Sequence, residues 1–317
     1  MTTWCFDTRP LSSSPGWEPR PRKESAKNSG HYQPGPIEIN AAIEKQIAKA
    51  LDEKVLGDIS ITILHKKTDN DRYRFYGVRA EKQYYPACVM KLACLPGISA
   101  VVREYPEIET EEFLEWMALS YGPSDTEPFS EIIDAVTETQ NWHSANPDQE
   151  RFADFEMRRL FFERYLADLG LLEGQRILNK VYPTETSNSP RGAEYRLLLK
   201  HGGNLMSTYA SAKLMLSIAE GDCLLEHRQW MSKWLVKHPQ KDPTIMFNVF
   251  SDDVKVQSKN GDGFGYYCET AYVEKGEEKY VISFFSLPGE APLSDGLQLR
   301  IYCADIIGNC IQQLTQY

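Results

Sequence analysis

The sequence lacks long apolar segments and clusters of basic residues. No run approaches the roughly 18 to 20 consecutive apolar residues that a membrane-spanning helix needs. The one short basic group, at residues 20–23, is interrupted by Pro21. The formal net charge is −10 at pH 7. Because phosphate contacts need clustered Lys and Arg, we expect neither a membrane span nor a nucleic-acid partner.

The sequence also lacks the paired spacings of disulfide frameworks and metal sites. Its seven cysteines include no CxxC pair and are odd in number, which favours reduced thiols in a cytosol. The six dispersed histidines include no HxxH or HExxH pattern, so we expect no metal and no cofactor. Residues 1–36 have no apolar segment of the signal-peptide type and are rich in Ser, Pro and Gly. We therefore expect a flexible tail on a cytoplasmic protein.

Hydrophobic periodicity predicts an α+β organisation. Apolar residues at every fourth position from Ile39 to Val55 predict a helix, followed by strands at residues 59–65 and 73–78. Helical patterns dominate residues 88–246, strands return between residues 254 and 287, and residues 296–314 predict a last helix. We expect an antiparallel sheet built from residues 37–87 and 247–317 and flanked by helices. Residues 88–246 would form an inserted helical domain, with the active site at the interface.

The first of three short motifs is YPACVMK at residues 85–91. A thiol in the first turn of a helix is favoured as thiolate by the helix dipole, and Lys91 follows Cys88 on the same helix face. A desolvated lysine can lose its charge and act as a base toward the thiol. The Cys-x-x-Lys spacing alone is a weak indication of a catalytic site, because a buried free cysteine usually serves as a small hydrophobic residue.

The second motif, Thr139-Gln140-Asn141, ends an apolar helix and offers a hydroxyl and an amide. The alternatives are a plain helix C-cap and the rival triplet at residues 144–146, which begins with Ser144. The third motif is SKNG at residues 258–261, where Lys259 on an edge strand would present its charge to a carboxylate. Gly261 would let a ligand backbone approach closely, although a hairpin turn is the alternative.

In chain order these motifs resemble those of the class A β-lactamase-like serine hydrolases, which share their fold with penicillin-binding proteins. The family pattern is Ser-x-x-Lys, Ser-x-Asn and Lys-Thr/Ser-Gly. YPACVMKL, AVTETQN and SKNG are similar to the three motifs in their contexts, and NLMST at residues 204–208 is similar to the start of a late helix. The resemblance covers roughly residues 39–314. It implies the serine β-lactamase/transpeptidase-like fold, with Cys88 in place of the nucleophilic serine.

The resemblance implies acyl transfer. Lys91 would take the proton of Cys88, and the backbone N–H groups of Cys88 and Asp262 would form an oxyanion hole. Thr139 would pass the proton to the leaving group, and Lys259 would orient a carboxylate. The substrate would contact Asn141, Asn260, Gly261 and Asp262. Glu185, on an irregular loop at residues 182–203, is the nearest match to the deacylating glutamate of the family, but the Leu-Asn that usually follows is absent.

The sequence therefore favours an acyl-enzyme-forming amide or thioester hydrolase or acyltransferase acting on a small-molecule or peptide-like substrate. A thioester reacts with amines more readily than an oxyester does, and Glu185 is a weak match, so transfer to an amine is favoured. If Cys88 replaced a native serine, this preference would not follow. Two alternatives stay open: a β-lactamase that hydrolyses penicillin-type amides, and a catalytically degenerate protein that only binds ligand.

Overall fold

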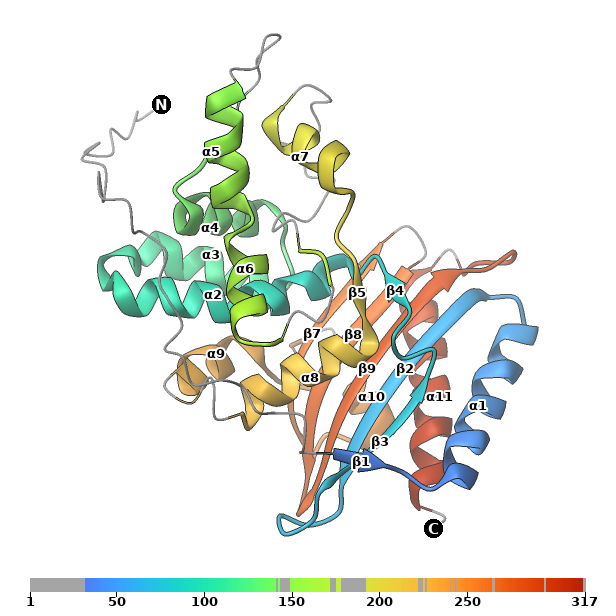
Figure 1. Cartoon of the computed structure of the whole chain (residues 1–317). Helices are drawn as coiled ribbons and strands as arrows, with labels where there is room; N and C mark the ends of the chain where they lie inside the picture. Colours follow the sequence, from blue (N-terminus) through green and yellow to red (C-terminus); the bar gives the residue numbers. More distant parts are fainter. Residues whose placement is uncertain are drawn as a thin grey trace.

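A seven-stranded sheet forms the centre of the molecule (Figure 1). The computed structural model describes residues 32–140, 142, 149–171, 175–177, 192–221, 225, 227–239, 241–242, 244–263, 266–293 and 295–315. The strands in spatial order are β1 (Tyr32–Pro34), β3 (Tyr73–Val78), β2 (Leu56–Lys66), β9 (Glu278–Pro288), β8 (Tyr266–Lys275), β7 (Lys255–Gly263) and β6 (Val236–Lys237). All neighbours are antiparallel except β1 and β3, which are parallel. The predicted α+β class, with a sheet drawn from both chain ends, is confirmed.

Helices α1 (Ile37–Asp52) and α11 (Gly296–Thr315) lie side by side against one face of the sheet (Figure 1). The spacing of four between Ile39, Ile43 and Ile47 places these residues on one helix face, and all three are buried. They share a core with Ile59 and Ile61 of β2, which point to the same face because strand side chains alternate. The predicted first helix is too long, since Val55 lies beyond its end at Asp52.

The other face of the sheet and one side of the molecule are covered by the helical block (Figure 1). Its helices are α2 (Met90–Glu104), α3 (Glu111–Tyr121), α4 (Glu127–Thr137), α5 (Gln149–Arg159), α6 (Phe161–Asp168), α7 (Ala193–His201), α8 (Thr208–Ala219) and α9 (Arg228–Leu235). A further short helix, α10 (Met246–Phe250), contacts α11. Helices α5 and α6 follow each other directly and meet at Leu160.

Two short strands depart from the predicted boundaries. β1 lies in the segment predicted as a flexible tail, and it pairs with β3. β6 lies within residues 88–246 and yet belongs to the main sheet, where Val236 pairs with Gln257 of β7. Strands of two or three residues carry no periodicity, so the sequence pattern cannot reveal them. A separate two-stranded sheet joins β4 (Gln83–Tyr84) to β5 (Met206–Ser207).

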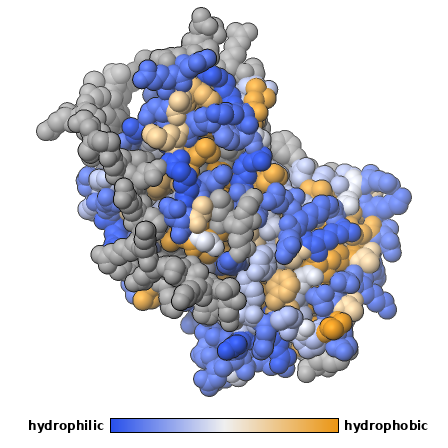
Figure 2. Space-filling model, in the orientation of Figure 1, coloured by the Kyte–Doolittle hydropathy of each residue, from blue (hydrophilic) through white to orange (hydrophobic). Residues whose placement is uncertain are grey.

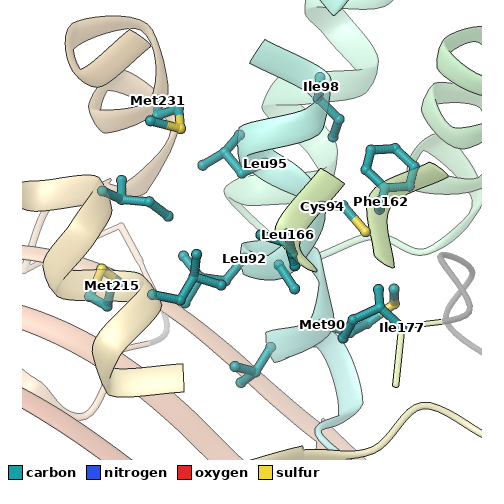
Figure 3. Packing of buried hydrophobic residues seen from close by; sticks show 14 of the residues in the cluster. Met90, Leu92, Cys94, Leu95, Ile98, Phe162, Leu166, Ile177, Met215 and Met231 are labelled. Carbon is teal, nitrogen blue, oxygen red and sulfur yellow. The ribbon is translucent and has the colours of Figure 1, made fainter. Parts of the chain in front are cut away.

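Helix α2 is the centre of the helical block. Every residue from Met90 to Val102 is buried, as expected of a helix that is surrounded on all sides. Figure 3 shows its apolar residues between Phe162 and Leu166 of α6, Met215 of α8 and Met231 of α9. This packing fixes the position of the α2 N-terminus, where the first sequence motif lies.

Helix α8 is joined to the sheet by buried hydroxyl groups. Thr208 forms hydrogen bonds with Ser60 and Thr62 of β2 at 2.7 and 2.9 Å. Ser211 lies 2.7 Å from Thr270 of β8, between the hydroxyl oxygens. The helix begins after Ser207, whose side chain accepts a hydrogen bond from Ala210 N. These bonds fix α8 and the sheet in one register, because each lost partner would leave a buried polar group unsatisfied.

The face drawn in Figure 2 is predominantly hydrophilic among the coloured residues, with apolar residues in separate patches. Within the part of the chain that the structure describes, no helix is both long and apolar enough to cross a membrane.

Candidate active site

Cys88 lies in a short 3₁₀ helix, η1 (Ala87–Val89), that leads directly into α2. The residue is 9% exposed. The preceding Ala87 has φ 46°, a left-handed conformation that is strained for a residue with a side chain. The packing of α2 and the short 3₁₀ helix hold Cys88 in this turn.

Gly261 of β7 packs directly on the backbone of Cys88. A Cβ atom at position 261 would lie 2.3 Å from the Cys88 nitrogen, so glycine is required there. The predicted close approach at Gly261 therefore involves the backbone of Cys88, where the sequence suggested a ligand backbone. This contact places β7 beside the first sequence motif.

Lys91 lies one turn after Cys88 and has no exposed surface. Its Nζ donates hydrogen bonds to the carbonyl oxygens of Ser124 at 2.9 Å and of Asp125, and lies 3.5 Å from that of Ser120. Burial lowers the pKa of Lys91 to about 8, although Cys88 and Asp125 act in the opposite direction. Burial therefore makes the neutral amine more accessible than it is in an ordinary exposed lysine.

Ser124 lies in the turn between α3 and α4, and it connects the two lysine motifs. Its hydroxyl oxygen accepts a hydrogen bond from Lys259 Nζ at 2.6 Å, and its carbonyl accepts from Lys91. The Cys88 thiol approaches the same carbonyl, with Sγ at 3.9 Å. Ser124 has φ 73°, so the site contains two residues with strained backbone, Ala87 before Cys88 and Ser124 in the facing turn. Ser124 was not among the residues predicted from sequence.

Lys259 of β7 is also completely buried. Besides Ser124, its Nζ contacts the carbonyl oxygen of Asn260 at 2.7 Å. Burial lowers the pKa of Lys259 well below its usual range, and the nearby Lys91 lowers it further. The sequence predicted that Lys259 presents its charge to a substrate carboxylate from an edge strand. The structure instead encloses this amine, and burial disfavours its charged form.

Thr139 does not join these residues. It follows the C-terminal end of α4, whereas Ser124 precedes the N-terminal end, and an 11-residue helix is about 16 Å long. Its hydroxyl instead contacts that of Thr137 at 2.6 Å. The placement of Thr139 beside Cys88 was therefore wrong. The other predicted residues of this region, Asn141 and Ser144, lie outside the described residues, as does Glu185.

The remaining predicted substrate contacts lie on β7. Asn260 is buried, and Asp262 is exposed and pairs with Arg300 of α11, with Arg300 Nε 3.0 Å from the carboxylate. The Asp262 side chain thus points to the α11 face, and only its backbone N–H can serve the predicted oxyanion hole. Among the described residues, no group of three or more His, Cys, Asp or Glu side chains is arranged to hold a metal ion.

Comparison with solved structures reveals the fold. The chain is similar to the class A β-lactamase of the last common ancestor of Gram-negative bacteria, with TM-score 0.61 and 13% identity over 86% of this chain and 99% of that one. It is also similar to the class A β-lactamase from Mycobacterium abscessus, with TM-score 0.60 and 14% identity over 87% and 100% of the two chains. The chain has the class A β-lactamase fold.

Comparisons of sequence are less informative. No protein-family model matches this sequence. Golvesin of Dictyostelium discoideum is 28% identical over 101 residues, which make up 32% of this chain. The match spans only 17% of golvesin.

Ser124 lies in a short sequence pattern that resembles a motif of class A β-lactamases. The family motif is Ser-Asp-Asn, and Ser124-Asp125 reproduces its first two residues just before α4, with Thr126 in third place. The Ser-Asp pair was the available signal. The motif was predicted instead at the other end of the same helix, where Asn141 offers the expected amide.

Proposed function

We propose that the protein forms an acyl-enzyme on Cys88 and is an amide or thioester hydrolase or acyltransferase. One observation carries this proposal. Cys88 Sγ, Lys91 Nζ and Lys259 Nζ, from three elements, all contact Ser124. A nucleophile, a lysine of lowered pKa and a hydroxyl held by a second lysine are groups that can together carry out acyl transfer.

Neutral Lys91 accepts the thiol proton as Cys88 Sγ attacks the substrate carbonyl carbon. A new S–C bond forms, and the carbonyl electron pair moves to oxygen, where the backbone N–H groups of Cys88 and Asp262 stabilise it. When the intermediate collapses, the bond to the leaving nitrogen or sulfur breaks. Ser124 donates its hydroxyl proton to that atom and recovers a proton from Lys91.

Lys259 has a different task from the one predicted from sequence. Because its Nζ donates to Ser124 Oγ, the hydroxyl hydrogen of Ser124 stays available for the leaving group. The second half of the reaction transfers the acyl group from Cys88 to an amine or to water and restores the thiol. We favour an amine, because a thioester is aminolysed readily.

A second candidate function is penicillin hydrolysis. Its support is the fold, since the similar solved structures are class A β-lactamases. A third is ligand binding without catalysis, which would explain the departures at Cys88, Thr126 and Asn260 from the family pattern.

Intact-mass measurement separates these functions. The purified chain is incubated with benzylpenicillin, with an acyl thioester of N-acetylcysteamine and with an activated anilide. We expect an acyl adduct on the wild type and on Cys94→Ala, and none on Cys88→Ala. Decay of the adduct that accelerates with added glycinamide indicates a transferase. Rapid turnover of benzylpenicillin in water indicates a β-lactamase, and the absence of any adduct leaves only ligand binding.

A further inference from the structure

Lys237 of β6 is a third buried lysine beside the site. It is 5% exposed, and its position is fixed by pairing with Val256 of β7. Its Nζ donates a hydrogen bond of 2.7 Å to the carbonyl oxygen of Tyr121. Among the described residues it makes no ion pair, and burial lowers its pKa. Burying this lysine is costly, because burial removes it from water and the carboxylates of Asp242 and Glu269 compensate only in part.

The carbonyl that Lys237 holds belongs to the last residue of α3. Tyr121 is also fixed at its other end, where its hydroxyl donates to the carbonyl oxygen of Lys91 at 2.9 Å. Directly after it comes the turn at residues 122–125, which contains Ser124 in its strained conformation. The turn has no regular secondary structure of its own, so its position depends on the groups that hold its ends.

Three lysines from three elements therefore contact one short segment, residues 121–125. Lys91 of α2 contacts the carbonyls of Ser124 and Asp125, Lys259 of β7 contacts the hydroxyl of Ser124, and Lys237 of β6 contacts the residue from which the turn begins. We infer that Lys237 is a positioning residue that fixes the end of α3 so that Ser124 meets both Lys91 and Lys259. This inference rests on the proposed function of the same site.

Charge supports the assignment. The groups that act on the pKa of Lys259 are Lys91 from α2, Cys88 from η1, Lys237 from β6 and Glu269 from β8. The Lys91 and Lys237 charges lower that pKa, whereas Cys88 and Glu269 raise it. Lys237 thus both positions the Ser124 turn and favours the neutral form of the amine that holds the Ser124 hydroxyl.

The test compares Lys237→Met and Lys237→Arg with Lys233→Met. Lys233 lies one turn earlier on α9, is exposed, and contacts Glu109 at the surface. We expect Lys237→Met to slow single-turnover acylation by about 10- to 100-fold, the effect of losing one hydrogen bond to a charged group, with substrate affinity unchanged. Lys237→Arg, which keeps a charged donor, should restore most of the rate. Lys233→Met should match the wild type.

Alkylation of Cys88 by iodoacetamide gives a second readout that needs no substrate. A changed rate in Lys237→Met but not in Lys233→Met supports the inference even if no probe acylates the wild type, in which case only the proposed function fails. Equal behaviour of Lys237→Met and Lys233→Met in both readouts overturns the inference. If Lys237→Met does not fold, as judged by circular dichroism, Lys237→Gln takes its place in the same comparison.

Discussion

The buried Lys91 makes stability depend on pH in a way that can be calculated. Its pKa falls from 10.5 to about 8 on folding because burial disfavours the charged amine. Between these two values the unfolded chain keeps a proton that the folded chain has lost. The free energy of unfolding therefore rises with pH across this window. Each pH unit contributes about 1.4 kcal/mol, which gives about 3 kcal/mol in total.

Replacing Lys91 by Met isolates this contribution. The variant also loses the hydrogen bonds to the carbonyls of Ser124 and Asp125, but that loss adds a nearly constant offset. We expect the stability of the wild type relative to Lys91→Met to increase by about 3 kcal/mol between pH 7.5 and pH 10.5. Groups that titrate in both proteins, such as the buried tyrosines, cancel to first order in the difference.

Urea unfolding followed by tryptophan fluorescence at several pH values measures this difference. Leu92→Met is the matched control, because it changes a neighbouring buried residue of α2 without removing a titratable group. Its stability difference from the wild type should not vary with pH. If the curve for Lys91→Met also stayed parallel to that of the wild type, Lys91 would have an ordinary pKa, and its role as a base would be refuted.

Three further predictions concern reactivity. Lys91→Met should lower the single-turnover acylation rate by roughly 10²- to 10⁴-fold. The wild-type acylation rate should rise with pH to a plateau above the Lys91 pKa of about 8. A pH profile that stayed flat would contradict the assignment of Lys91 as the base. Ser124→Ala should slow release of the leaving group by roughly 10²-fold or more, as measured by stopped-flow absorbance. Thr139→Ala should have no effect on this rate. The reverse result would restore Thr139 to the site. Peptide mapping after brief iodoacetamide treatment should find Cys88 labelled before the fully buried Cys94. Equal labelling of the two cysteines would argue against an activated thiol. Cys88→Ser should transfer acyl groups to amines more slowly than the wild type does.

The fold was predictable because its long elements carry strong patterns. The spacing of Ile39, Ile43 and Ile47 identifies α1, and the runs of apolar, aromatic and β-branched residues in β2, β8 and β9 identify the sheet. Cys88 and Lys91 could be paired from sequence because one helical turn separates them. Lys259 needed the order of the motifs as well, since its contact with Ser124 joins distant segments.

The second motif could not be located by the same reasoning. An apolar helix with polar residues at both ends has the same periodicity whichever end faces the site. Periodicity alone therefore cannot choose between Ser124 and Thr139, because the choice depends on the tertiary position of α4. Lys237 was hidden for a related reason, because it lies in a two-residue strand whose pairing with β7 has no local signal.

The pairing of β2 with β9 constrains how the chain reaches its native state. Ser60 lies opposite Phe285, so the central strands of the sheet come from nearly opposite ends of the sequence (Figure 1). During synthesis β2 can meet β3 and α1 early, but its edge toward β9 stays unpaired until almost the whole chain has emerged. Such long-range pairing makes folding slow and exposes unpaired strand edges to aggregation. The helical block, whose contacts are closer in sequence, is expected to form first and to hold the β2 segment beside the place that β9 later occupies.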